Sequence, residues 1–347
     1  MAISAIAPEV LQHILSEYGI PADSATTLLN LDDGDHHHDP AWRVDTGGDP
    51  MVLRLIAERE WSWLGHQWYS DELLSAQLRF VDHLQQRRIP FPARRVPSGG
   101  EWVVAHGADT RYRAVGFEWL PADPGIETPT EAIAHGAGRL LASLHGAATD
   151  FTRTEGLGTE SLLGWARQVA DELSALTVGV PATIGRIMSR HVDDIRRQVD
   201  SVGELSCRLA GHGDLNVPNV LIRRGAVVGA VDIGRIALID PTEELANVVR
   251  WFSERKIDGK RVPEPALAAA VVAGYRSTSA GQAISAPLPE LTWLSAATAP
   301  HLFFPVRKAL AAGTAVDEDW LAARIDARRT EADRLRDIMR ALTRGRA

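Results

Sequence analysis

The spacing of apolar positions differs between the first third of the chain and the remainder. An amphipathic stretch at residues 1–20 predicts a helix, and a stripe repeating every three to four residues predicts another over 71–88. Short apolar runs bounded by polar turns predict strands at residues 27–31, 41–45, 51–56, 102–104 and 112–120. The first part is therefore predicted to open with a helix and a three-stranded meander.

Beyond Pro121, Pro124 and Gly125, which interrupt the pattern, helical periodicity dominates. Helices are predicted at residues 130–146, 160–175, 185–200, 243–253, 264–276 and 316–342. One β-hairpin, at 221–231 with its turn at Arg223-Arg224-Gly225, is predicted among them. The pattern indicates an α+β fold in two lobes. A small β-rich lobe spans 1–120, and a larger helical lobe with an embedded hairpin spans 121–347.

Composition narrows the functional classes. The 347 residues include 37 basic and 45 acidic side chains, and the net charge of −8 argues against a nucleic-acid partner held by bulk phosphate attraction. No apolar run approaches the length of a membrane span, and the N-terminus lacks a basic signal region, so we expect no membrane partner and a cytoplasmic protein. The single cysteine, Cys207, excludes a disulfide framework within the chain and is expected to be buried and inert.

Candidate chemistry is concentrated in the stretch His212-Gly213-Asp214-Leu215-Asn216-Val217-Pro218-Asn219 and in Asp232 beyond the hairpin. Asp214 lies in a loop bounded by Gly and Pro, and Asn219 contributes an amide oxygen five residues later. Carboxylate and amide oxygens suit Mg²⁺, which also retains waters and phosphate oxygens. A second carboxylate could accept a hydroxyl proton. These residue types together point to phosphoryl transfer.

This stretch resembles the H-G-D-x-x-x-x-N catalytic-loop motif of the aminoglycoside phosphotransferase and choline kinase superfamily, which shares the protein-kinase-like fold. Val231-Asp232-Ile233-Gly234-Arg235 resembles the metal-binding strand end of that superfamily. Asp240-Pro241 followed by Glu244-Leu245-Ala246 resembles its D-P-x-x-D-L-A continuation, with Glu in place of the second Asp. The segments 52–55, 78–80 and 89–92 look closest to homoserine-kinase-type and antibiotic kinases.

The resemblance implies an ATP-dependent kinase that uses Mg²⁺, with GTP an open alternative as donor. It implies that Asp214 is the catalytic base, that Asn219 and Asp232 hold the metal ion, and that His212 supports the loop. The segment Phe117-Glu118-Trp119-Leu120 would bind adenine through its backbone, so residues 1–120 would bind the nucleotide and 121–347 would carry catalysis and the acceptor.

Two positions depart from the superfamily pattern. Arg54 stands where a strand lysine is usual; its guanidinium can still bind phosphate oxygens. Gln77 stands where a glutamate would pair with that cation, so a hydrogen bond would replace an ion pair. The segment Asp32–Asp39 has the place of the phosphate-covering loop, and Gly34 is its one glycine. This loop is expected to be solvated rather than to bind a metal.

Several interpretations stay open on the sequence alone. Asp240 has a structural alternative as the cap of a helix that begins beside it. A further group is assigned with equal weight to an acceptor pocket or to the core of the helical lobe: Trp251, Phe252, Trp293, His301, Phe303, Phe304 and Arg307.

The preferred function is phosphorylation of a hydroxyl on a small molecule, in particular an amine-bearing antibiotic or natural product. A metabolic kinase for an amino alcohol, homoserine or a sugar is the close alternative. A protein Ser/Thr kinase and a non-catalytic nucleotide-binding protein are the alternatives of another class.

Overall fold

The computed structural model describes residues 7–29, 40–57, 60–61, 67–68, 70–106, 111–123, 128–177, 180, 182–205, 207–257, 260–279, 287–299 and 317–344. The chain divides into two compact units. The first contains residues 1–122, 151–157 and 229–233. The second contains residues 123–150, 158–228 and 234–347.

The first unit is built on an antiparallel sheet. Its strands lie in the order β1 (Thr26–Leu28), β2 (Ala41–Val44), β3 (Met51–Ala57), β8 (Arg111–Glu118) and β6 (Arg94–Arg95), and β7 (Val103–His106) also pairs with β8. A separate two-stranded ribbon is formed by β4 (Glu60–Trp61) and β5 (Gln67–Trp68). The predicted meander is confirmed, since β1, β2 and β3 pair in sequence order.

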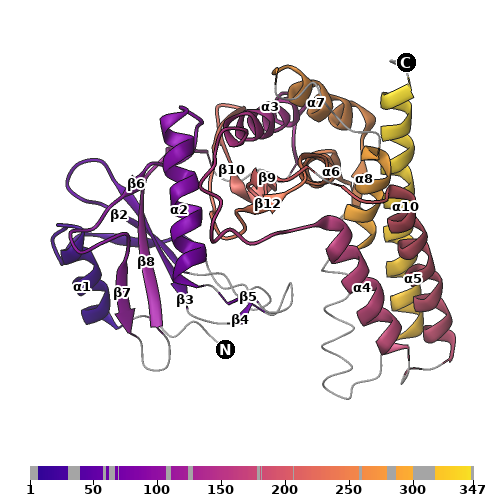
Figure 1. The fold of residues 1–347 in the computed structure, drawn as a ribbon, viewed down its shortest axis with the longest axis horizontal. Helices are drawn as coiled ribbons and strands as arrows, with labels where there is room; N and C mark the ends of the chain where they lie inside the picture. Colours follow the sequence, from indigo (N-terminus) through magenta and orange to yellow (C-terminus); the bar gives the residue numbers. More distant parts are fainter. Residues whose placement is uncertain are drawn as a thin grey trace. The chain divides into compact units, whose positions relative to one another are not determined.

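Two helices belong to the sheet unit (Figure 1). In α1 (Pro8–Glu17), Ile14 and Leu15 are buried in one apolar cluster with residues of the sheet. In α2 (Asp71–Gln86), the hydroxyl of Ser70 accepts a hydrogen bond from the backbone N–H of Leu73 at 3.1 Å and caps the helix. The predicted stripe of α2 is confirmed, because Leu74, Leu78, Val81 and Leu84 are all buried.

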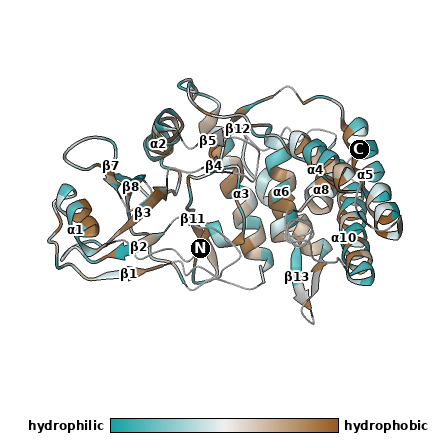
Figure 2. Ribbon diagram, turned by 90° about the horizontal axis from the view of Figure 1, so that it is seen from below, coloured by the Kyte–Doolittle hydropathy of each residue, from teal (hydrophilic) through white to brown (hydrophobic). Residues whose placement is uncertain are grey.

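The second unit is largely helical. Its described helices are α3 (Glu131–Ala148), α4 (Leu162–Leu176), α5 (Ala182–Val202), α6 (Pro241–Phe252), α7 (Pro265–Arg276), α8 (Leu288–Ala297) and α10 (Glu318–Arg344). Helix α3 packs on α7, α4 packs on α5, and α8 packs on both α6 and α10. Hydrophilic and hydrophobic residues alternate around α5 and α10, as expected for helices that bury one face (Figure 2).

Three strand pairs accompany these helices. Strand β9 (Leu209–Gly211) pairs with β12 (Ala237–Ile239), β10 (Val220–Arg223) with β11 (Ala226–Ala230), and β13 (Glu254–Ile257) with β14 (Lys260–Pro263). The predicted hairpin is confirmed as β10–β11, and its two-residue turn has left-handed backbone at both positions, with φ of 52° at Arg224 and 75° at Gly225. The expectation of a single hairpin in this lobe is wrong, because β13–β14 forms a second.

Helix α8 and strands β9 and β12 were not predicted from the sequence, because they lack a periodic signal. Helix α8 is buried on nearly every face, so no amphipathic period marks it. Strands β9 and β12 are three residues long, too short for a pattern to emerge. Within the described part of the chain, no helix is both long and apolar enough to cross a membrane.

Candidate functional site

The loop that follows β9 is held in a compact shape by its backbone. Gly213 has a φ of +76°, and a Cβ at this position would lie 2.1 Å from the carbonyl oxygen of Arg235. Only glycine satisfies both the left-handed backbone and the close approach. Asp214 follows Gly213 directly, so this close packing explains why a glycine precedes the aspartate.

The carboxylate of Asp214 is oriented by two amide side chains of its own loop. Asn216 donates from Nδ2 to Oδ1 of Asp214 at 3.0 Å. Asn219 donates from Nδ2 to the backbone oxygen of Asp214 at 2.8 Å and to Oδ2 at 3.3 Å. Because the NH₂ group of Asn219 faces Asp214, its Oδ1 is the atom left to accept from another group or to coordinate a cation. The loop therefore contains a half-buried carboxylate with fixed geometry and an oriented amide oxygen.

Asn216 also organises the second half of the loop. Its Oδ1 accepts the backbone N–H of Asn219 at 3.0 Å and caps the short 3₁₀ turn Val217–Asn219. Pro218 lies within this turn, which is followed at once by β10. Asn216 was not predicted to have a role of its own, although an Asn placed four residues before the start of a strand is a recognisable turn signal.

Asp232 lies just beyond β11 and belongs to the first unit, as does Arg54 on β3. The guanidinium of Arg54 forms an ion pair with Oδ1 of Asp232. Asp232 has a φ of +76°, a left-handed conformation that costs a non-glycine residue about 1 kcal/mol or more.

The other predicted nucleotide-binding residues of this unit have distinct environments. Gln77 is buried on α2; its predicted hydrogen bond to Arg54 stays a prediction. Phe117 is buried on β8, while the backbone amides of Glu118 and Trp119 donate to the carbonyl oxygens of Ala93 at 2.8 Å and of Pro50 at 3.1 Å. Hydrogen bonds from this segment to a base would therefore use its carbonyl groups or Leu120 rather than those two amides.

The supporting residues of the loop lie where the backbone needs them. His212 is buried, and its Nδ1 accepts the backbone N–H of Asp214 at 3.3 Å. Asp240 is the N-cap of α6, and its Oδ1 accepts the backbone N–H of Thr242 at 2.8 Å. The structural alternative for Asp240 is thus confirmed.

A buried acid on α6 connects the loop to the helical core. Oε1 of Glu244 accepts the backbone N–H of Gly213 at 2.9 Å, and its Oε2 lies 2.9 Å from Nε2 of His145 on α3. Burial would raise the pKa of Glu244, but the hydrogen bond and electrostatic interaction with His145 outweigh it and, with His212 and the Gly213 N–H, lower this pKa. Glu244 is therefore an anion, and one of its hydrogen bonds comes from Gly213, the residue directly before Asp214.

The sequence analysis noted Glu244 only as a variant of a motif, and it did not identify His145. The signal for His145 was a histidine within the apolar stripe of 130–146. A buried histidine requires polar partners, and these come from α6 and α7, far along the chain.

Some predicted residues lie outside the described part of the structure or have another environment. The segment Asp32–Asp39, which includes Gly34, and the residues 301–307 lie outside the described residues. Phe252 and Trp293 are buried, which favours the core alternative for these two. The expectation that Cys207 is buried is wrong, because this cysteine is exposed just before β9.

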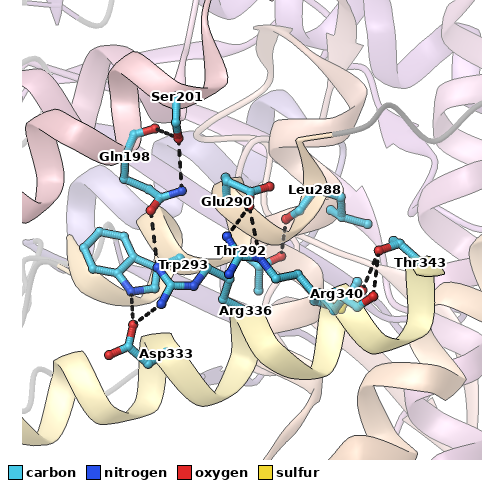
Figure 3. Close-up of polar contacts among 11 residues, drawn as sticks. Gln198, Ser201, Leu288, Glu290, Thr292, Trp293, Asp333, Arg336, Arg340 and Thr343 are labelled. Carbon is cyan, nitrogen blue, oxygen red and sulfur yellow. Dashed lines mark hydrogen bonds and ion pairs between the residues drawn. The ribbon is translucent and has the colours of Figure 1, made fainter.

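A groove of about 500 Å³ is lined by residues of α5, α8 and α10. Figure 3 shows polar contacts among several of these residues. Four arginines and three acids line it together with Trp293, whose Nε1 donates to Asp333 at 2.9 Å. Arg336 also pairs with Asp333, and Arg340 pairs with Glu290, at 2.6 and 2.8 Å. Arg336 and Asp333 both lie on α10, whereas the pair of Arg340 and Glu290 links α10 to α8, so these charges compensate one another within and between helices.

Comparison with protein families identifies one match. The family model described as the phosphotransferase enzyme family matches residues 31–288, which include the loop, the hairpin and Asp232. No curated protein matches the sequence.

Comparison with solved structures finds the same fold in several kinases. A microcompartment-associated aminopropanol kinase has a TM-score of 0.64 at 20% identity, covering 94% of this chain and 97% of its own. A choline kinase from Cryptosporidium parvum has a TM-score of 0.59 at 12% identity, covering 97% and 98%. A spectinomycin phosphotransferase in complex with ADP and its antibiotic has a TM-score of 0.58 at 12% identity, covering 98% and 99%. These likenesses confirm the predicted bilobal protein-kinase-like fold.

Proposed function

We propose, since the chain belongs to the phosphotransferase enzyme family, that it transfers the γ-phosphoryl group of a nucleoside triphosphate to a hydroxyl group of a small amine-bearing molecule. The observation that carries this proposal is the fixed geometry of Asp214, whose carboxylate is held by Asn216 and Asn219. A carboxylate held in one orientation can position an acceptor hydroxyl for attack.

In the proposed step, Asp214 accepts the hydrogen bond of the acceptor O–H and takes its proton as the new bond forms. The acceptor oxygen bonds to the γ-phosphorus, and the bond between that phosphorus and the β,γ-bridging oxygen breaks. The electron pair of the broken bond leaves with the nucleoside diphosphate. Asp214 suits this role because it is half-buried and accessible, whereas Glu244 is fully enclosed.

Asn219 and Asp232 are the proposed metal ligands. The donor set fits Mg²⁺, because it consists of an oriented amide oxygen and a carboxylate, which are hard oxygen ligands. Mg²⁺ would neutralise charge on the phosphates of the donor nucleotide. The described residues contain no cluster of three or more His, Cys, Asp or Glu side chains able to hold a metal.

Arg54 is proposed to bind the phosphates that are not transferred. Its ion pair with Asp232 places a cation next to the proposed metal ligand. A guanidinium can contact phosphate oxygens through two N–H groups at once. We assign nucleotide binding to residues 1–120, and catalysis and acceptor binding to residues 121–347.

The acceptor is proposed to be an antibiotic or another natural product with amine and hydroxyl groups. The net charge of −8 weakly favours cationic acceptors, and the spectinomycin phosphotransferase shares the fold across nearly the whole chain. A small amino alcohol is a second candidate, favoured by the TM-score of 0.64 with the aminopropanol kinase. The choline kinase likewise acts on a small hydroxylated cation.

Two other classes are less well supported. A protein kinase regulated by an activation segment would need a long loop after Asp232, but only residues 233–240 separate it from α6, and β12 occupies part of them. A non-catalytic nucleotide-binding protein would not require the side chains that orient Asp214.

The test is phosphate transfer by the purified chain, with ATP or GTP and Mg²⁺, to a panel of aminoglycosides, other amine-bearing natural products and amino alcohols. Product is detected as nucleoside diphosphate release together with the mass of a phosphorylated acceptor. We expect Asp214→Asn to lower kcat by at least about 100-fold, with nucleotide affinity retained. Asp171→Asn, which changes an exposed aspartate on α4, is the matched control. Nucleotide binding without transfer to any acceptor would overturn the proposal.

A further inference from the structure

We propose that Tyr275 on α7 is a positioning residue for the catalytic loop, acting through His145 and Glu244. The hydroxyl oxygen of Tyr275 lies 2.7 Å from Nδ1 of His145. The other ring nitrogen, Nε2, lies 2.9 Å from Oε2 of Glu244. Oε1 of Glu244 accepts the backbone N–H of Gly213 at 2.9 Å. The chain of contacts thus ends one residue before the proposed base, and it rests on the function proposed above.

The direction of each hydrogen bond follows from the charge of its partners. Glu244 is anionic and can only accept, so Nε2 of His145 carries a hydrogen and donates to it. Burial raises the pKa of Tyr275, which keeps its hydroxyl protonated. When the imidazole is neutral, Nδ1 then accepts the O–H of Tyr275. Glu244 thus sets the tautomer, and the tyrosine hydroxyl supplies the partner that the buried Nδ1 requires.

The surroundings leave these groups little freedom. Helices α3 and α7 touch through their backbones, since a Cβ on Gly274 would lie 1.9 Å from the carbonyl oxygen of His135. The rings of His145 and Tyr275 meet edge to face with centroids 5.6 Å apart. His145 is 2% exposed and Glu244 is 1% exposed. Water cannot readily replace a lost partner in such a site. If one hydrogen bond is removed, the remaining buried groups must therefore rearrange.

Loss of the tyrosine hydroxyl would leave Nδ1 of His145 without its buried partner, while Glu244 still requires a hydrogen on Nε2. The ring would then shift to find another partner for Nδ1, which strains the hydrogen bond to Glu244. Glu244 would then shift, and the backbone of Gly213 would follow it. The expected consequence is a displaced Asp214 and slower chemistry, with no change at the groups that contact nucleotide.

The test compares Tyr275→Phe with Tyr18→Phe in the whole chain. Tyr18 is a matched control because its hydroxyl is largely enclosed and donates to the carbonyl oxygen of Ala114 at 3.0 Å, in the other compact unit. We expect Tyr275→Phe to lower kcat by about tenfold or more, with the KM for nucleotide within about twofold of wild type. Tyr18→Phe should lose similar thermal stability but retain kcat.

A spectroscopic readout separates positioning from general destabilisation. The ¹⁵N chemical shifts of the His145 ring report which nitrogen carries the hydrogen. All three proteins should show hydrogen on Nε2, but Tyr275→Phe should shift the Nδ1 resonance away from its position in wild type and Tyr18→Phe, because the hydrogen bond to Nδ1 is lost. An unchanged ¹⁵N pattern, or a kcat for Tyr275→Phe equal to that of Tyr18→Phe, would overturn the proposal. If wild type itself transfers no phosphate, the proposed function fails, and this proposal fails with it.

Discussion

Gly211 and Glu244 occupy adjoining space so tightly that a Cβ on Gly211 would lie 2.2 Å from Oε2 of Glu244. Glu244 reaches both Gly213 and His145 from this position. The motif that the sequence resembles has the shorter aspartate at position 244. Gly211 is the last residue of β9, and its lack of a side chain leaves room for the longer acid. The two residues therefore form a matched pair.

The stability losses from exchanging the two residues should therefore be less than additive. Gly211→Ala brings the added Cβ against the buried carboxylate of Glu244 and, at 2.4 Å, against Cγ2 of Ile239, so a shorter acid relieves only part of the clash. Glu244→Asp withdraws an acceptor from two buried donors. Each should lower the free energy of unfolding by about 2 kcal/mol. The double variant should be more stable than the sum of the two losses predicts, by about 1 kcal/mol. Urea unfolding of all four proteins measures this coupling, and strictly additive losses would contradict it.

The buried imidazole of His191 should make stability depend on pH. Burial lowers the pKa of His191 to about 4, against a partly opposing hydrogen bond to the carbonyl oxygen of Ala297. Between pH 6.5 and 4 the unfolded chain binds a proton that the folded chain does not. The free energy of unfolding should therefore fall as the pH drops through this range, by about 3 kcal/mol from this residue.

His191→Gln tests this dependence, since glutamine can still donate to Ala297 without titrating. Urea unfolding at pH 7 and pH 5 should show a smaller acid loss in this variant than in wild type. His13→Gln, at an exposed position on α1, is the control and should retain the wild-type loss. An equal acid loss in His191→Gln and wild type would show that this histidine is not responsible.

Glu331 on α10 should also make stability depend on pH, but with the loss at higher rather than lower pH. Burial, with the hydrogen bond and charge of Glu254, raises the pKa of Glu331 to about 8, although Arg328 and Arg250 oppose the shift. The folded chain holds a proton here that the unfolded chain releases above its ordinary pKa. Stability is therefore fully present at low pH and is lost as the pH rises toward 8.

Glu331→Gln mimics the protonated form and should remove this loss. Between pH 6 and pH 8, we expect the free energy of unfolding of wild type to fall by about 1–2 kcal/mol more than that of the variant. Glu204→Gln, an exposed position, should follow wild type at both values. A variant that loses as much stability as wild type on going from pH 6 to 8 would contradict the assignment.

Arg54 offers a kinetic prediction for the proposed nucleotide site. Arg54→Ala should raise the KM for the nucleotide by about tenfold or more, because a cation that contacts phosphates is lost. Arg54→Lys should lie between this variant and wild type, since lysine restores the charge but not the paired N–H groups. Arg111→Ala, which removes another ion-paired arginine from the same sheet, is the control. Unchanged nucleotide kinetics in Arg54→Ala would mean that another residue binds the phosphates.

Local patterns in the sequence predicted the elements that carry their own signal. The stripe of α2 and the β10–β11 turn at Arg224-Gly225 could be identified because helical periodicity and positive-φ turns depend on neighbouring residues. The wholly buried helix α8 has no such signal, because its partners α6 and α10 lie in other parts of the chain. The exposure of Cys207 likewise depends on packing that a single sequence does not display.

By itself, the sequence determined the chemical groups of the candidate site. Asp214, Asn216 and Asn219 lie within six residues of one another, so their spacing alone brings them into one loop. Only the tertiary structure decided what holds that loop in place. Glu244 meets His145 across 99 residues, and His145 meets Tyr275 across 130. Contacts over such separations form only when helices that are distant in the sequence pack together. Packing removes these polar groups from water, so they must form hydrogen bonds with one another.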